Sequence, residues 1–197
     1  MIEEKRLKES ESRVKKYIEQ NIVKSKQKNE FASFFVFNSD KSLNSAKALY
    51  ELSTNQDMQK KTGFVNFDGF LWVINASYYS MFYMVKALLE KNGIKINSDL
   101  SIHLVTFDCL IYFFYLNSKL EKKFIEDFIE SKEEASELLG KQKADLLIED
   151  YFWEKNKRAT FTYQTKQIIL KSKAKTSLER AKRFNQEIKN IINTKPK

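Results

Sequence analysis

The chain has 197 residues, and its 35 Lys and Arg against 26 Asp and Glu give a net charge of +9 at pH 7. This length fits one large domain, or one domain with an added arm, and the 42% of hydrophobic residues suffice for a packed core. The single Cys excludes a disulfide framework, a cysteine-based zinc site and an iron–sulfur cluster, and the single His excludes a site that needs two imidazoles.

The glycine and proline content indicates the fold class. A β-sandwich or α/β domain of this size needs many tight turns, and such turns are rich in Gly and Pro. The chain has four Gly and one Pro, so we predict an all-α protein.

The first 38 residues are predicted to form a charged helix and an aromatic linker. Residues 1–13 contain no apolar stretch of the kind found in secretory signals, which favours a cytoplasmic protein. A helix with a thin apolar stripe is expected over 3–28, either as an arm that packs on the dimer or a partner, or as a solvated spacer. Residues 29–38 hold four Phe in a pattern too short and irregular to predict a helix.

The main domain is expected over 39–193, followed by a disordered tail at 194–197. Its first helix begins at a cap formed by Ser39 or Asp40, and the polar residues 55–63 are expected to form a loop. The next helix, over 67–92, is apolar nearly all round, which predicts a buried central helix. Gly93 fits the C′ position that ends this helix.

The most apolar run, 100–116, is predicted to be a buried helix, continuing to residue 117, and no contact with a membrane is expected. It is shorter than the ~20 residues that cross a bilayer, and it contains Asp108, whose charge is costly in lipid. In a packed core, Asp108 should be paired with a Lys or Arg across the bundle. Cys109 is expected to be a small buried hydrophobic residue.

The last third of the chain holds an acidic and then a basic segment. An acidic helix is expected over 120–139, ending at Gly140, and a final helix over 167–193. Residues 155–197 hold 13 Lys and Arg against two acidic residues, so the whole positive excess lies there. Such a segment attracts phosphate backbones without base specificity. The candidate nucleic-acid contacts are Lys155, Lys157, Lys166, Lys171, Lys175 and Lys182.

Two alternatives for this basic segment stay open. Its lysines can form a solvated face that is partly neutralised by the acidic residues of 121–154. The final helix can also lie on a membrane surface, a weaker alternative because it lacks the Trp that such helices often carry.

Several motifs follow one another in an order typical of a known family. The segment 75–83 has the sequence NASYYSMFY, 87–89 is ALL, Gly93 follows, and His103 comes after a short loop. Further on, 158–163 is RATFTY and 181–188 is AKRFNQEI. Together these motifs resemble the HEPN family, the higher eukaryotes and prokaryotes nucleotide-binding domains, over about 43–192.

This resemblance implies an antiparallel helical bundle that forms a homodimer with its Arg motifs facing each other. Active family members are metal-independent ribonucleases, and many act as toxins beside a small nucleotidyltransferase. The resemblance makes Arg158 the group that holds the scissile phosphate, since a guanidinium binds phosphate through two hydrogen bonds. The family's His, which moves protons, is replaced here by Tyr163, whose phenol has an ordinary pKa of about 10.

Each of these residues also has a structural alternative. Tyr163 can carry a proton, stack on a base, accept a nucleotide from a transferase, or anchor the last helix as a half-buried ring. Arg158 can pair with carboxylates of the preceding helix. Tyr79 and His103 are candidate site-lining residues, with core packing and a helix-entry role as the alternatives.

Two functions are therefore expected, and both involve RNA or a protein partner. The first is an RNA-directed ribonuclease of a toxin–antitoxin or defence system. The second is a non-catalytic module that binds nucleic acid or a nucleotidyltransferase through its basic C-terminal helix. The sequence has no Gly-rich phosphate loop and no metal-ligand motif, so neither a cofactor nor a metal is expected.

Overall fold

Long helices and one small sheet make up the fold. The computed structural model describes the backbone of residues 4–97, 101–152 and 160–193, and the side chains of residues 4–97, 101–138 and 170–193. The helices are α1 (Glu4–Glu19), α2 (Ala32–Thr54), α3 (Gln56–Thr62), α4 (Phe70–Lys91), α5 (Ile102–Leu110), α6 (Lys122–Phe152) and α7 (Thr160–Asn193). The π-helical turn η1 (Ile111–Tyr115) continues α5, and β1 (Val23–Lys24) pairs antiparallel with β2 (Lys95–Ile96). The predicted all-α class is confirmed.

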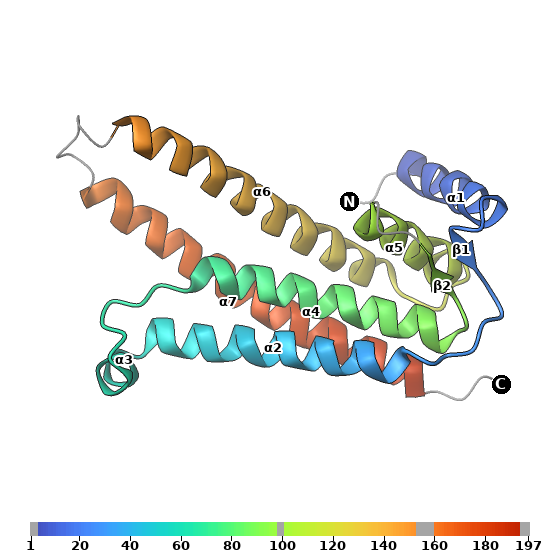
Figure 1. Cartoon of the computed structure of the whole chain (residues 1–197), viewed down its shortest axis with the longest axis horizontal. Coiled ribbons are helices and arrows are strands. Elements are labelled where there is room, and N and C mark those ends of the chain that lie inside the picture. Colours follow the sequence, from blue (N-terminus) through green and yellow to red (C-terminus); the bar gives the residue numbers. More distant parts are fainter. Residues whose placement is uncertain (1–3, 98–100, 153–159, 194–197) are drawn as a thin grey trace.

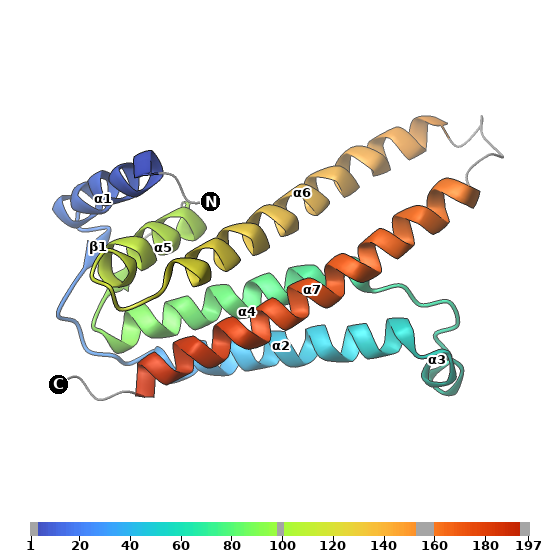
Figure 2. The same cartoon turned by 180° about the vertical axis from the view of Figure 1, so that it is seen from behind.

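Helix α4 is the central element of the fold. It lies along α2 and α7, and α6 packs on it from a further side (Figure 1). The same arrangement is seen from behind in Figure 2. Most of α4 is buried, as the apolar pattern of 67–92 predicts, and Met81 and Leu88 have no exposed surface. Each such side chain stabilises the fold by about 1.5–3 kcal/mol when it is fully buried.

Helix α4 ends at the predicted glycine. Gly93 has a φ of +70°, which lies in the left-handed region. A Cβ atom added there would lie 2.8 Å from the backbone oxygen of Gln27, whose own amide donates to the Gly93 carbonyl at 3.0 Å. The backbone conformation and this close approach both require glycine at the end of α4.

Helix α1 packs on α5 of the same chain through a buried ion pair. Asp108 is fully buried and accepts hydrogen bonds from the Arg13 guanidinium and from the Ser10 hydroxyl, each at 2.8 Å. The predicted partner of Asp108 across the bundle is thus Arg13, and Cys109 is buried as predicted. Because Val14 is buried in the same core, α1 belongs to the packed structure, which neither the arm nor the spacer hypothesis anticipated.

The N-terminal elements differ from the predicted ones in their limits. Helix α1 ends at Glu19, well before residue 28, because the chain turns at Asn21, where φ is +58°, and enters β1. Helix α2 begins at Ala32, so it includes most of the segment 29–38 and crosses the predicted boundary at residue 38. The phenylalanines did not reveal this helix because several of them, including Phe34 and Phe37, are more than half exposed and form no core-facing stripe.

Ser39 is not a helix cap, contrary to the prediction. It lies buried inside α2, and its hydroxyl donates to the backbone oxygen of Ser80 at 2.8 Å. The Asn185 amide donates to the hydroxyls of both serines, at 3.1 and 2.6 Å. A small polar side chain can therefore mark a contact between α2, α4 and α7 as well as a helix start.

The predicted loop at 55–63 is also wrong, because it holds helix α3. The Asn55 side chain caps this helix by accepting from the Met58 amide at 3.0 Å, and Gly63 ends it with a φ of +78°. Asn55 and Gly63 are both typical helix-end residues. The segment between them, however, is polar and only two helical turns long.

Helices α6 and α7 are longer than predicted. Helix α6 passes through Gly140 and reaches Phe152, and α7 begins at Thr160, well before residue 167. One glycine inside a helix costs about 1 kcal/mol, which is not enough to end a helix of good helix formers. Both helices extend past the N-terminal end of α4 in Figures 1 and 2. The predicted tail at 194–197 lies outside the described residues.

Within the apolar run 100–116, residues 102–115 form α5 and η1, where Phe107, Leu110 and Phe114 are buried in the core. Within the described part of the chain, no helix combines the length and the apolar character needed to cross a bilayer.

Candidate functional site

Part of the predicted RNA site lies outside the described residues. This holds for Arg158 and for Lys155 and Lys157, which precede α7. Tyr163 lies in the first turn of α7, and Lys166 follows one turn later, but the side chains of both are outside the description. The described part of the site is therefore the stretch of α7 from Leu170 onwards.

The described lysines of α7 differ in their surroundings. Lys171 and Lys175 are exposed, and neither forms an ion pair with another described residue. Lys182 is already held by Glu179 of the same helix, at 2.7 Å. Lys189 is held by Asp40 of α2, at 2.6 Å. Within the described stretch of α7, the lysines that have no ion-pair partner among the described residues thus precede Arg180.

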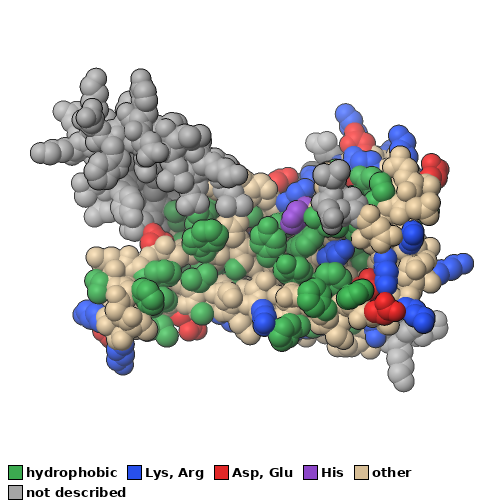
Figure 3. Space-filling view, in the orientation of Figure 1, with side chains coloured by type: hydrophobic (Ala, Val, Ile, Leu, Met, Phe, Trp, Pro, Cys, Tyr) green, Lys and Arg blue, Asp and Glu red, His purple; other side chains and the backbone are tan. Residues whose placement is uncertain are grey.

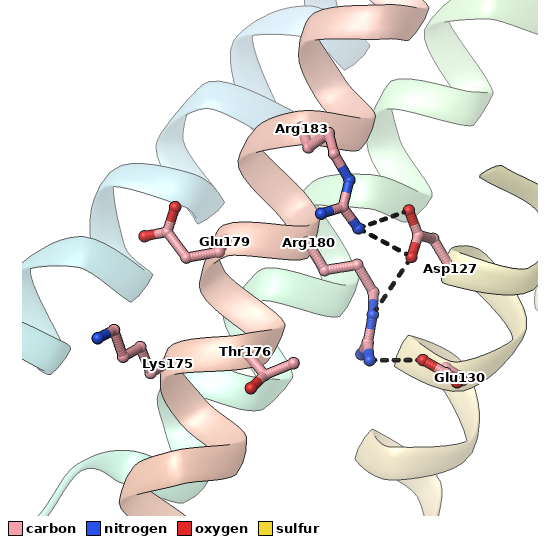
Figure 4. A pocket seen from close by; sticks show the side chains of 7 residues that line it. All are labelled: Asp127, Glu130, Lys175, Thr176, Glu179, Arg180 and Arg183. Atoms are coloured by element: carbon pink, nitrogen blue, oxygen red, sulfur yellow. Dashed lines mark hydrogen bonds and ion pairs between the residues drawn. The ribbon is translucent and has the colours of Figure 1, made fainter. Parts of the chain in front are cut away.

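The arginines of α7 face the acidic helix α6. Figure 4 shows Arg180 and Arg183 of α7 pointing towards Asp127 and Glu130 of α6. These four residues line a hollow of about 400 Å³. Arg180 binds the carboxylates of Glu130 and Glu134 at 2.6 and 2.9 Å, and Arg183 binds Asp127 at 3.0 Å. The acidic helix therefore neutralises the two arginines, and Arg180 is buried against it rather than solvated. Lys171 and Lys175 are exposed, which both the nucleic-acid hypothesis and the solvated-face alternative expect.

This set of ion pairs was not predicted from the sequence. Arg180 and Arg183 are three residues apart, which places them on neighbouring positions of one helix face, and Asp127 and Glu130 have the same spacing in α6. This matched spacing in the two helices could have predicted the ion pairs.

Tyr79 and His103, the two predicted site-lining residues, lie next to each other. Their ring centroids are 5.8 Å apart, and Tyr79 is 40% exposed. The neighbouring Tyr78 is buried, and its hydroxyl lies 2.7 Å from Nδ1 of His103. The Phe82 ring is 4.3 Å from the imidazole and completes an aromatic wall around it. One tyrosine of the pair thus packs in the core while the other faces outwards.

The surroundings of His103 keep its imidazole neutral. Burial lowers the pKa of His103 below its ordinary value of 6.5, and the nearby Lys132 ammonium lowers it further. Burial also raises the pKa of Tyr78 above its ordinary value, so its hydroxyl keeps its proton. When this hydroxyl donates to Nδ1, the imidazole carries its own proton on Nε2. His103 is then a hydrogen-bond donor at neutral pH.

Among the residues described, no group of three or more His, Cys, Asp or Glu side chains could hold a metal ion. Compared with known protein families, curated proteins and solved structures, the chain gives no match.

Proposed function

We propose that the chain is an RNA-associated protein of HEPN type from a toxin–antitoxin or defence system, and that it binds RNA through the N-terminal half of α7. One observation carries this proposal. Lys171 and Lys175 are exposed and form no ion pair with a described residue, whereas Arg180 and Arg183 are neutralised by α6. Exposed lysines on one helix attract a phosphate backbone by releasing its counterions.

The arrangement of the helices supports the family part of the proposal. The block with the sequence NASYYSMFY lies in the central helix α4, and its Tyr78 contacts His103 at the start of α5. Helix α7, which carries the last motif of the resemblance, packs along α4. The helices that carry these motifs thus contact one another directly.

We further propose that this protein cleaves RNA without a metal ion. In such cleavage the 2′-hydroxyl gives up its proton and attacks the adjacent phosphorus, the bond from phosphorus to the 5′-oxygen breaks, and the leaving 5′-oxygen takes up a proton. Charge develops on the phosphate oxygens on the way to a 2′,3′-cyclic phosphate and a 5′-hydroxyl. Arg158 would hold these oxygens through its planar guanidinium. Tyr163, five residues further on, would stand at the position of the proton-transferring residue.

A non-catalytic module is the second candidate, and the replacement of the family's His by Tyr163 favours it. A phenol with a pKa of about 10 is a weak base at neutral pH. In this case the chain would bind RNA, or a nucleotidyltransferase that is itself part of the system, through the same basic segment. Formation of a homodimer belongs to both candidates.

A metal-free cleavage assay separates the two candidates. Total RNA is incubated with the wild type, Arg158→Ala and Tyr163→Phe in the presence of EDTA, and binding is followed on the same samples at two salt concentrations. Cleavage that is lost in Arg158→Ala supports the ribonuclease. Salt-sensitive binding with intact RNA in every lane supports the binding module. If the RNA is neither cleaved nor bound, the RNA proposal is overturned.

A further inference from the structure

A second group of basic side chains surrounds one cluster of aromatic rings, away from α7. Phe107 of α5 stacks on Phe128 of α6 with ring centroids 6.2 Å apart, and Phe128 lies 5.9 Å from Tyr78. The Arg6 guanidinium of α1 lies over the Phe107 ring, 5.0 Å from its centroid. His103 is joined to the cluster by its hydrogen bond with Tyr78. Helices α1, α4, α5 and α6 therefore meet around these rings.

Lys132 brings a second cation to this cluster, beside Arg6. It lies one helical turn after Phe128 in α6, which places both side chains on the same face of the helix. It is half-buried, and the neighbouring basic residues, the Arg6 cation and the neutral His103, come from two other helices. In Figure 3 the one histidine of the chain lies at the surface among hydrophobic and basic side chains.

The carboxylates around this cluster are engaged by cations, one of which is Arg6 itself. Asp108 is fully buried and bound by Arg13 and Ser10, and Glu9 also lies 3.7 Å from Arg13. Glu133 is 3.7 Å from Arg6 and its side chain is 65% exposed. No described carboxylate lies within ion-pair distance of Lys132. Burial and the charge of Arg6 lower the pKa of the Lys132 amine, and the carboxylates of Asp108 and Glu133 offset this effect only in part.

An exposed aromatic ring borders this group of cations. Tyr79 is 40% exposed and lies 5.8 Å from His103, while its partners Phe82 and Tyr83 hold it from the side at 6.4 and 6.3 Å. A tyrosine ring beside basic side chains is a common platform for a base of single-stranded nucleic acid, since the base stacks on the ring and the cations hold the phosphate.

We propose that Arg6, Lys132 and His103 bind a phosphate group of single-stranded RNA, and that the Tyr79 ring stacks on the adjacent base. This inference rests on the proposed function, because it names a second RNA contact beside that of α7. Helix α1, which lies outside the HEPN resemblance, supplies Arg6 and thereby completes the site. The Nε2–H of the neutral His103 and the two permanent cations would donate to the phosphate oxygens.

The first test measures the affinity for a single-stranded oligouridine by fluorescence anisotropy. Lys132→Gln removes the half-buried charge, and Lys123→Gln, an exposed lysine of the same helix, is the matched control. We expect about a fivefold to tenfold weaker affinity for Lys132→Gln and no change for Lys123→Gln, because one phosphate contact is lost. Tyr79→Ala should weaken the affinity by about tenfold through the lost stacking.

The second test does not depend on RNA binding by the rest of the protein. His103 is the only histidine in the chain, so its ring signals in NMR spectra report on this site alone. Uridine monophosphate should shift these signals in the wild type, and uridine, which lacks the phosphate, should not. The shift should be lost in Lys132→Gln and kept in Lys123→Gln, and unchanged spectra elsewhere show that both variants are folded.

The outcomes distinguish the two proposals. If the oligouridine binds but Lys132→Gln and Lys123→Gln behave alike in both tests, the site is wrong and RNA binding through α7 stands. The oligouridine can also fail to bind while uridine monophosphate shifts the His103 ring signals in the wild type but not in Lys132→Gln. In that case the phosphate site stands and the RNA function is wrong. If neither ligand has an effect, both proposals are overturned.

Discussion

Asp108 and Arg13 form the buried ion pair that attaches α1 to α5, and its two partners differ in exposure. The Asp108 side chain is fully buried, whereas the Arg13 side chain is 32% exposed. Removing one partner leaves the other without its counter-charge, and the cost depends on whether water can reach the charge that remains. The consequences of the two single substitutions are therefore unequal.

We predict that Arg13→Leu destabilises the protein more than Asp108→Asn does. Arg13→Leu leaves a buried carboxylate and should lower the free energy of unfolding by about 3–5 kcal/mol. Asp108→Asn leaves a guanidinium that can reach water, and should cost about 1–3 kcal/mol. Urea unfolding of both variants measures these values. Equal losses would contradict the role assigned to burial.

The second prediction at the residue scale concerns the protonation of His103. Removal of the Lys132 charge by Lys132→Gln should raise the pKa of His103 towards 6.5, because a nearby like charge is lost. The pKa is measured by NMR titration of the single imidazole. A pKa that stays the same in this variant would place the Lys132 ammonium further from the ring than the structure has it.

The same lowered pKa affects stability at acidic pH. The folded protein binds a proton at His103 less readily than the unfolded chain does. The contribution of the neutral His103 to stability is therefore fully present above pH 6.5. This contribution should be lost as the pH falls from 6.5 through the lowered pKa of the folded state. In His103→Gln, the pH dependence of the unfolding free energy in this range should become weaker.

At the scale of elements, the ends of α3 and α4 offer a matched comparison. Gly63 and Gly93 both have a left-handed φ, at +78° and +70°. A Cβ atom at Gly63 would meet nothing within 4 Å, while one at Gly93 would lie 2.8 Å from the Gln27 carbonyl oxygen. The two positions thus share the backbone strain and differ in the steric clash.

We predict that Gly63→Ala costs about 1 kcal/mol and that Gly93→Ala costs clearly more. The difference between the two variants measures the clash with the segment before α2, because the cost of the left-handed φ cancels. Thermal unfolding of both variants provides the comparison. Equal losses would mean that the Gln27 backbone moves away freely.

Much of the fold could be predicted where only one structural role suited a residue. An all-round apolar helix must be buried, Gly93 directly after its last apolar turn fits the helix end, and Asp108 in an apolar helix must find a cation. These features are α4, Gly93 and the Arg13–Asp108 pair. Ser39 and Gly140 had more than one solution, since a serine can cap a helix or join two helices, and a glycine can end a helix or lie within it.

At the scale of the whole molecule, less of the candidate site could be predicted. The sequence locates the basic segment, but not which of its charges acidic residues neutralise, because that depends on how α6 and α7 face each other. Arg180 is bound by α6 while Lys171 and Lys175 have no described partner. Arg6 and Lys132 lie far apart in the sequence, so only the packing of α1 and α6 around Phe107 and Phe128 shows that they are neighbours.

The central claim is that the N-terminal half of α7 binds RNA, and its salt dependence is the most direct test. The affinity for a single-stranded RNA is measured across a range of salt concentrations for the wild type, for the double variant Lys171→Gln/Lys175→Gln, and for the control Lys60→Gln/Lys61→Gln, which changes two exposed lysines of α3. Log affinity falls as log salt rises, and the loss of two phosphate contacts should make this negative slope shallower by about 1.4. The control should keep the slope of the wild type. Equal slopes for the two double variants would contradict the account.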